Sequence, residues 1–201
     1  MTTKLLYRFF LAGLLAFVII LPARASSVLP LYLDQIIDGA AVAFQGTCIE
    51  NRTERDSQTG LIVTYTSFQV QDVLKGQVES THTIKQAGGQ LPGPASDLVS
   101  RMDGVPSFRV GASYVVFLYG VSAAGFSSPV GLAQGKFSVL PGPAGLQVSN
   151  GRKFGDMTAN RAALVLPQSA QAQQGQVPEQ GDRIGLDAFK QLVRQRTAVP
   201  K

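Results

Sequence analysis

Alternating apolar and polar residues, interrupted by glycine-rich turns, constrain what this chain can fold into more than any other feature. From residue 41 the apolar side chains recur at every second position, and the same period returns along residues 61–74 and 81–86. A period of two is typical of a strand with one buried face, whereas a helix repeats every 3.6 residues. Residues 112–119, ASYVVFLY, are almost wholly apolar, which indicates a strand buried on both faces. The pattern therefore predicts a domain built mainly from strands.

The first two strands are expected to form a hairpin. The first runs from residue 41 to Cys48, with Val42, Phe44 and Cys48 on one face, and residues 51–60 form its polar connection. The second strand, over residues 61–74, pairs back on the first.

The later part of the body has fewer regular signals. Residues 88–111 are rich in Gly and Pro and predict a long irregular loop. Strands are expected over residues 130–140 and, after a Pro-Gly-Pro turn, over residues 146–149. Gly76 and Gly111 each stand at a strand end, where we expect tight turns that use glycine's freedom to adopt positive φ.

Helical spacing is confined to the two ends of the body. Residues 31–38 and 186–196 place apolar side chains three and four positions apart, which predicts one short and one longer amphipathic helix. Five or six short strands with terminal helices predict an all-β barrel or sandwich. Strands of this number and unequal length favour a small five- to six-stranded OB-like Greek-key barrel.

The N-terminus is typical of an export signal. Residues 1–8 carry Lys4 and Arg8 without an acid, residues 9–23 form an uncharged apolar run, and Ala23-Arg24-Ala25 is a small-residue cleavage site. An uncleaved membrane anchor is the alternative, but fifteen residues fall short of the about 20 that a spanning helix needs. We therefore expect residues 1–25 to be a signal peptide and the mature protein to be secreted or periplasmic.

The remaining chain divides by composition. Residues 26–166 hold the strand pattern and are expected to form the barrel domain. Residues 167–181 are a Gln-rich segment with little to bury, which indicates a linker. Residues 182–201 contain the closing helix.

The net charge argues against nucleic acid as a partner. Removal of residues 1–25 lowers the formal charge from +5 to +2, because three cations and no acids leave with them. A nucleic-acid surface needs clustered Lys and Arg on one face, and only short basic spots are present, such as Arg152-Lys153. We expect the partner to be another exported or envelope protein.

Three segments together resemble known proteins: residues 39–46, residues 65–76, which end in VLKG, and residues 108–117, FRVGASYVVF. The order resembles exported bacterial proteins of unassigned activity. More remotely, it is similar to netrin-like domains, the OB-fold class that includes tissue inhibitors of metalloproteinases. The resemblance covers about residues 31–140 and implies an OB-fold. Those inhibitors present an N-terminal Cys to the protease zinc and carry many disulfides, whereas this chain has only Cys48.

Catalytic chemistry has few candidates in this sequence. His82 is the only imidazole, and Ser122 lies in Gly120-Val121-Ser122-Ala123-Ala124, which misses the G-x-S-x-G nucleophile elbow at its last position. Other triad orders exist, so a catalytic His82 stays open beside the alternative of a strand-surface residue. We assign no catalytic residue.

Cofactor and metal chemistry also lack a recognisable site. Cys48 shares a strand face with Val42 and Phe44 and is expected to be a core residue, with an intermolecular disulfide or a reactive thiol as alternatives. Acids and arginines alternate around residues 50–56, which indicates a solvated, self-paired turn or, less simply, a cation site. We therefore expect no metal and no cofactor.

These observations predict an exported, non-enzymatic binding module, in the role of inhibitor or accessory of another secreted or envelope protein such as a protease. Its expected contact surfaces are the loop over residues 88–111 and the hairpin over residues 50–60. The alternatives are a secreted hydrolase with an unidentified Ser or Asp site, and a structural protein of the envelope.

Overall fold

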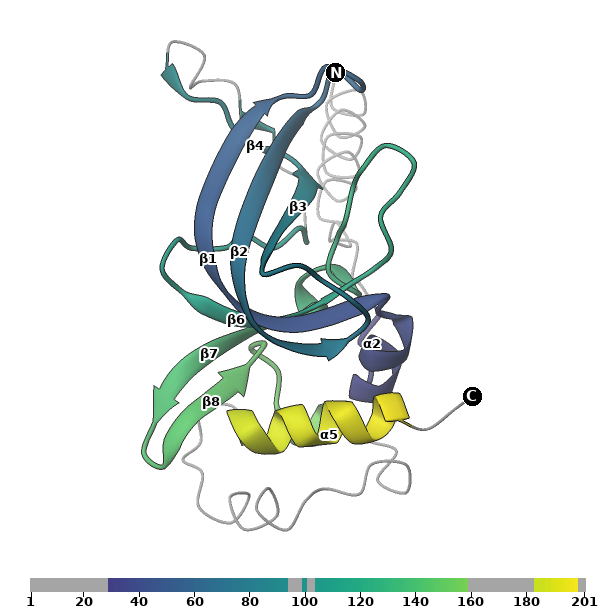
Figure 1. Ribbon diagram of the computed structural model, residues 1–201, viewed down its shortest axis with the longest axis vertical. Coiled ribbons are helices and arrows are strands. Elements are labelled where there is room, and N and C mark those ends of the chain that lie inside the picture. The colour runs from purple at the N-terminus through teal and green to yellow at the C-terminus, as the bar shows by residue number, and fades with distance from the viewer. Residues whose placement is uncertain (1–28, 94–98, 101–103, 159–182, 199–201) are drawn as a thin grey trace, which may run out of the picture.

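A long, curved antiparallel hairpin organises the fold (Figure 1). Strand β1 (Val42–Arg55) pairs antiparallel with β2 (Ile62–Lys75), which is the hairpin that the sequence predicts, although it is longer than expected. The computed structural model describes residues 29–93, 99–100, 104–158 and 183–198. The expected signal peptide and the Gln-rich segment 167–181 lie outside these residues.

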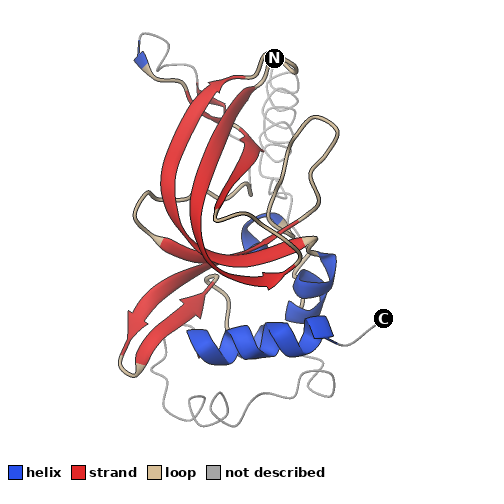
Figure 2. Cartoon of the chain, in the orientation of Figure 1, coloured by secondary structure: helices blue, strands red, loops and turns tan. Residues whose placement is uncertain are grey.

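The other elements are short (Figure 2). In chain order they are α2 (Leu33–Gly39), β3 (Thr81–Ala87), β4 (Gly89–Gln90), β5 (Val99–Ser100), β6 (Ser113–Leu118), the 3-10 turn η2 (Leu132–Gly135), β7 (Lys136–Gly142), β8 (Gly145–Ser149), α3 (Phe154–Met157), β9 (Ile184–Gly185) and α5 (Leu186–Ala198).

The strands form a mostly β architecture, which confirms the predicted class. Seven of them make one antiparallel sheet in the order β3-β2-β1-β6-β7-β8-β9, and β4 pairs with β5 separately. The sheet exceeds the five or six strands expected, because the chain returns after the Gln-rich segment to add β9 beside β8. β3 and β9 are its two edges.

The first hairpin extends further than predicted. The prediction ended β1 at Cys48, but the strand continues to Arg55 through residues that had been expected as a polar connection. Ile49 has no partner in the register, so a bulge separates the buried half from the polar half. Beyond it the backbone ladder continues, and the hydroxyls of Thr53 and Thr64 meet across the strands at 3.0 Å. Polar side chains are compatible with a strand there because solvent covers them.

The expected strand over residues 130–140 is correct only in its second half. Val130 donates its N–H to the carbonyl of Phe117, and then Gly131 and Leu132 adopt left-handed φ values of +62° and +60°. Left-handed residues break an extended backbone, so a 3-10 turn precedes β7, which begins at Lys136. The described parts of the expected loop over residues 88–111 contain the short strands β4 and β5.

The sheet separates two hydrophobic cores, and β6 serves both. Tyr114, Val116 and Leu118 face one core, whereas Val115 and Phe117 face the other. This two-sided burial is what the apolar run ASYVVFLY predicts. The first core lies within the curve of β1, β2, β3 and β6 and contains Phe44, Cys48, Phe68, Ile84, Phe108, Tyr114, Val116 and Leu118.

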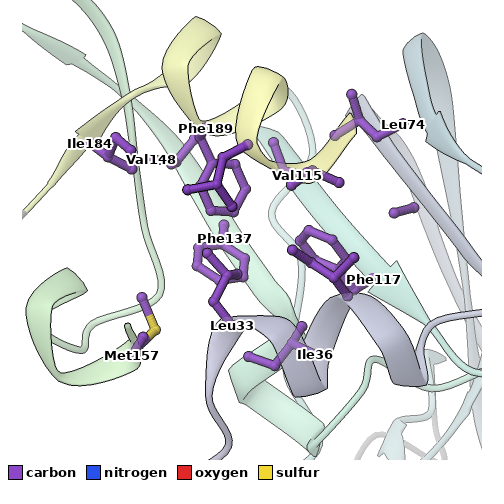
Figure 3. Close-up of a cluster of buried hydrophobic side chains, with 14 of the residues drawn as sticks. Leu33, Ile36, Leu74, Val115, Phe117, Phe137, Val148, Met157, Ile184 and Phe189 are labelled. Atoms are coloured by element: carbon purple, nitrogen blue, oxygen red, sulfur yellow. The ribbon is translucent and has the colours of Figure 1, made fainter. Parts of the chain in front are cut away.

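The second core lies under the helices (Figure 3). Leu33 and Ile36 of α2 meet Phe117 of β6, Phe137 of β7 and Phe189 of α5 there. The aromatic rings pack edge to face or tilted, with centroids 4.8 Å apart for Phe137 and Phe189. Burial of these apolar faces holds both helices against the sheet.

Ion pairs fix the orientation of α5, the helix expected over residues 186–196. Asp72 on β2 binds Lys190 at 3.0 Å and Arg194 at 2.6 Å. Arg196 donates two hydrogen bonds to the carboxylate of Asp38 at the end of α2, the shorter of 2.6 Å. These pairs set the helix across β2 and α2 at the side of the sheet away from the first core.

Candidate functional site

A groove opens where β6 and β7 separate. Their pairing ends at Tyr114 and Ser138, while β7 runs on to Gly142 and, among the described strands, pairs there with β8 alone. The groove has a volume of about 370 Å³. It is lined by Gln45, Gln71, Arg109, Gly111, Ala112, Ser113, Tyr114, Ser138, Val139, Leu140, Pro141 and Leu146. Gln45, Gln71 and Ser113 contribute to its polar wall, and Val139, Leu140 and Leu146 to its apolar wall.

A chain of hydrogen bonds crosses the polar wall. The Nε2 of Gln45 donates to the Oε1 of Gln71 at 2.9 Å, and the Nε2 of Gln71 donates to the Oγ1 of Thr47 at 3.1 Å. The Thr47 hydroxyl then meets the Ser113 hydroxyl at 2.8 Å. Gln45 and Thr47 project from the face of β1 opposite Cys48, since side chains alternate along a strand.

One atom of this wall is unsatisfied. Gln45 is only 8% exposed, and its Oε1 is buried without a hydrogen-bond partner. A buried acceptor left without a donor costs about 1–3 kcal/mol. Such an atom beside a groove is a reason to expect a donor from a ligand.

Arg109 supplies the charge of the groove. The chain turns over residues 109–112, where the N–H of Ala112 donates to the carbonyl of Arg109 at 3.1 Å and Gly111 has a φ of +82°. Two backbone bonds between this turn and Cys48 hold it against β1. Arg109 is exposed, and its guanidinium makes no hydrogen bond or ion pair with any residue that the structure describes. A guanidinium stays charged at all ordinary pH values, so the groove carries a positive charge that no described residue pairs with.

An aromatic cluster of Phe68, Phe108 and Tyr114 packs beside the turn that carries Arg109. Phe108 packs edge to face on Phe68 and on Tyr114, with centroids 4.9 and 5.2 Å apart. The hydroxyl of Tyr114 accepts the N–H of Arg109 at 2.9 Å. The ammonium of Lys136 lies over the rings of Phe108 and Tyr114 and donates to the carbonyl of Ser107 at 2.6 Å. Burial lowers the pKa of Lys136. The groove wall is therefore held in place by packing and hydrogen bonds.

Cys48 is a core residue, as its strand phase predicts. It is fully buried in the cluster that includes Phe44 and Phe68. Burial raises the pKa of the Cys48 thiol, so the reactive thiolate is disfavoured.

We therefore expect a thiol reagent to label Cys48 slowly in the native protein and completely after denaturation. Cys48→Ala should lower the free energy of unfolding by about 1 kcal/mol or more through a small cavity, and Cys48→Ser should cost more because its hydroxyl needs a partner. Mass spectrometry of the labelled protein and urea unfolding measure these effects. Fast native labelling, or a dimer that disappears with reductant, would contradict the core assignment.

The two catalytic candidates are not brought together among the described residues. His82 lies partly buried on β3, its ring edge-on to Phe44 with centroids 5.3 Å apart. Burial lowers the pKa of His82. Ser122 lies in the loop after β6, where its Oγ accepts the N–H of Phe126 at 3.0 Å. His82 and Ser122 therefore have different neighbours, and no contact between them is formed in the described part of the chain.

The expected self-paired turn at residues 50–56 is wrong for Asp56. Arg52 and Glu54 do pair with each other. Asp56 instead is buried and binds Lys85 of β3 at 2.8 Å, and its other oxygen accepts from the Thr59 hydroxyl at 2.6 Å. The reason is that the hairpin connection folds toward β3, the strand that pairs with β2 on the sheet edge.

Lys85 also holds the loop after β6. Its ammonium donates to the carbonyl of Ala124 at 2.9 Å and lies 4.7 Å from the centre of the Phe126 ring. Its backbone carbonyl accepts the N–H of Ser127 at 3.0 Å. The Asp56–Lys85 pair therefore joins three segments that are distant in the sequence.

The hydrogen bonds from Lys85 and Thr59 lower the pKa of Asp56 from 3.8 to about 2. A lowered folded-state pKa means that this carboxylate stabilises the fold above about pH 4, and that its contribution is lost as the pH falls toward 2. We expect acid unfolding of the wild type to steepen over this interval and Asp56→Asn to flatten that part of the curve. Unfolding monitored by circular dichroism from pH 6 to 2 measures it, with Glu50→Gln as an exposed control. Identical acid profiles for wild type and Asp56→Asn would refute the role of the pair.

The sequence reasoning did not single out the groove residues. The strand alternation placed Gln45 and Thr47 together on one face of β1, which was a usable signal, but Arg109 and Ser138 carry none. The described ranges contain no group of three or more His, Cys, Asp or Glu side chains that could hold a metal ion. In the same ranges no helix has the length and apolar character needed to cross a membrane.

Comparisons of the chain with protein-family models, with curated proteins and with solved structures found no match.

Proposed function

We propose that this protein is an exported, non-enzymatic binding module that holds part of another secreted or envelope protein in the β6–β7 groove. The observation that carries the proposal is that one groove contains both Gln45, whose buried oxygen has no donor among the described residues, and Arg109, whose exposed charge no described residue pairs with. The buried Gln45 oxygen lacks a donor among the described residues, and the exposed Arg109 guanidinium is available to pair with an anion. A ligand that provides a hydrogen-bond donor and an anion would satisfy them together.

The export part of the proposal is supported by the sequence. The basic start, the apolar run and the Ala23-Arg24-Ala25 site favour cleavage after Ala25 and a secreted or periplasmic location. The resemblance to netrin-like domains favours an inhibitor or accessory role toward a protein such as a protease. The absence of a second Cys argues that any inhibition uses another surface than the N-terminal Cys of that family.

We also propose that the first core is enclosed by an OB-like barrel. β1, β2, β3 and β6 curve around it, and residues 127–130 lie between the two ends of this set. Ser127 bonds to Lys85 on β3, and Pro129 forms a bridge with Leu118 on β6. These contacts support closure of the sheet through a short extended segment.

Photo-crosslinking from two matched positions tests the proposed function. A photoreactive amino acid replaces Leu146, which is exposed and lines the groove, or Val121, which is exposed in the loop after β6 and does not line it. We expect irradiation of the exporting cells to give one discrete adduct with an exported protein from position 146. The same adduct should be weakened by Arg109→Glu and absent from position 121.

Equal adducts from both positions would contradict the proposal, since they would report non-specific encounter. Failure of position 146 to give any adduct that depends on Arg109 would contradict it as well.

A further inference from the structure

We infer that the β6–β7 groove binds an extended peptide segment that carries a carboxylate. The inference rests on the proposed function and names the chemistry of its ligand. Four features support it: the free charge of Arg109, the neutralised surroundings of that charge, the acceptors along the groove, and the apolar wall.

Charge selects an anion. Arg109 is the only charged side chain among the residues that line the groove in the described structure. Asp72, the register partner of Gln45 on β2, would otherwise repel an anion, but Lys190 and Arg194 already bind both of its oxygens. A carboxylate can meet a guanidinium through two parallel hydrogen bonds, and it is the anion that a peptide itself carries.

The backbone of β7 offers an acceptor to the ligand. Pro141 is paired with Leu146 of β8, and because proline has no N–H these residues cannot exchange the two bonds of a hydrogen-bonded pair. Pro141 therefore sits at a non-hydrogen-bonded position, where the carbonyl points away from β8. Pro141 lines the groove, so this oxygen faces the side on which β6 has ended.

The acceptors match the donors of a peptide backbone. Pro141 and Gln45 both line the groove, and the Gln45 Oε1 is buried without a donor among the described residues. For this oxygen to accept a ligand N–H, the Gln45 amide must turn toward the groove and give up the hydrogen bond from its Nε2 to Gln71. An extended peptide presents N–H groups along its length, and so it can supply donors to one side while its carboxylate reaches Arg109.

The apolar wall favours a peptide over an acidic sugar. Val139, Leu140 and Leu146 line the groove and can pack against apolar side chains of a peptide. Sugar rings are commonly bound on exposed aromatic faces, but Tyr114, the aromatic residue of the groove, is only 5% exposed. The lining therefore matches a peptide with an acidic residue or its own terminal carboxylate.

The experiment starts from random ten-residue peptides displayed in two formats, one ending in a free carboxylate and one with both ends blocked. The mature protein selects binders, and the most enriched peptide is synthesised and titrated by fluorescence anisotropy. We expect enrichment of Asp or Glu at one position in the blocked format, or selection restricted to the free-carboxylate format. These two results distinguish the two sources of the carboxylate, and both support the inference.

A double-mutant cycle then assigns the contact. Replacing the peptide carboxylate by an amide should weaken binding to the wild type at least tenfold and should change binding to Arg109→Gln by less than threefold. Arg52→Gln, which removes an exposed arginine on the far half of β1, is the matched control and should bind like the wild type. Methylation of a backbone nitrogen of the peptide should weaken binding at alternate positions.

Peptides that bind wild type and Arg109→Gln equally would overturn the inference, and so would Arg109-dependent binding of heparin oligosaccharides without peptide binding. The result is separable from the proposed function. An Arg109-dependent adduct from position 146 without any peptide binder would leave the binding function standing and refute the peptide. A peptide whose binding depends on its carboxylate, without any adduct in cells, would support the peptide inference and contradict the proposed function.

Discussion

Replacing Phe189 by alanine is expected to lower the free energy of unfolding by about 3–5 kcal/mol. Phe189 is fully buried, and its ring contacts Phe137, Phe117 and Phe154, each from a different element. Truncation leaves a cavity where α5 meets β6, β7 and α3, and these elements cannot all move to fill it. Urea unfolding followed by circular dichroism measures the loss.

Two further variants distinguish the stability lost to the cavity from the stability lost by any substitution in α5. Phe189→Leu keeps most of the apolar volume and should lose clearly less stability than Phe189→Ala. Gln191→Ala, an exposed position of the same helix, should change the unfolding free energy by less than about 0.5 kcal/mol. A loss below about 1 kcal/mol for Phe189→Ala would mean that α5 does not dock on the sheet as described. If Phe189→Ala fails to fold, the leucine variant alone tests the packing.

Gly76→Val is expected to be the second strongly destabilising change, at about 2–6 kcal/mol when backbone strain and overpacking are added. Gly76 directly follows β2 and has a φ of +71°, which a β-branched residue adopts only under strain. A Cβ at this position would lie 2.6 Å from the carbonyl oxygen of Ala41 and 2.9 Å from Val42. The backbone at Ala41, just before β1, would have to shift to admit it.

Gly111→Val is the matched control for this change. The sequence predicts both glycines as tight turns, and both have positive φ, but a Cβ at Gly111 would meet nothing within 4 Å. Gly111→Val should therefore show the strain alone, about 1–3 kcal/mol. Thermal and urea unfolding of the two variants should rank Gly76→Val as the more damaging. If Gly111→Val is the more damaging variant, then the close approach of Ala41 and Val42 to Gly76 is not the reason that position 76 requires glycine.

These stability variants also bear on the groove. Gly111 lines the groove and stands in the turn that carries Arg109, so Gly111→Val should weaken ligand binding more than its stability loss alone explains. Gly76 does not line the groove and should affect binding only through the folded fraction. A comparison of binding at equal folded concentration separates the two roles.

Several elements of this protein could be read from local patterns. The period of two identified β2, β3 and the buried face of β1, including Cys48, because the alternation of side chains along a strand is a property of the strand itself. An almost wholly apolar run identified β6. The spacing of Leu186, Phe189 and Leu192 identified α5 for the same reason. The ends of elements were less predictable. β1 continues through polar residues because β2 supplies its backbone hydrogen bonds, and β7 starts late because Gly131 and Leu132 turn the chain.

The sequence by itself determined the strand-rich class, the positions of most strands and helices, and the burial of Cys48. Only the tertiary structure decided which side chains meet. Asp56 closely follows Arg52 and Arg55 in the sequence, yet its ion-pair partner is Lys85 on another strand. Gln45, Arg109 and Pro141 line one groove only because β1 pairs with β6 and β6 parts from β7 at Ser138. Local periodicity reports which way a side chain faces, whereas the neighbour it faces depends on strand pairing between distant segments, and no local pattern encodes that choice.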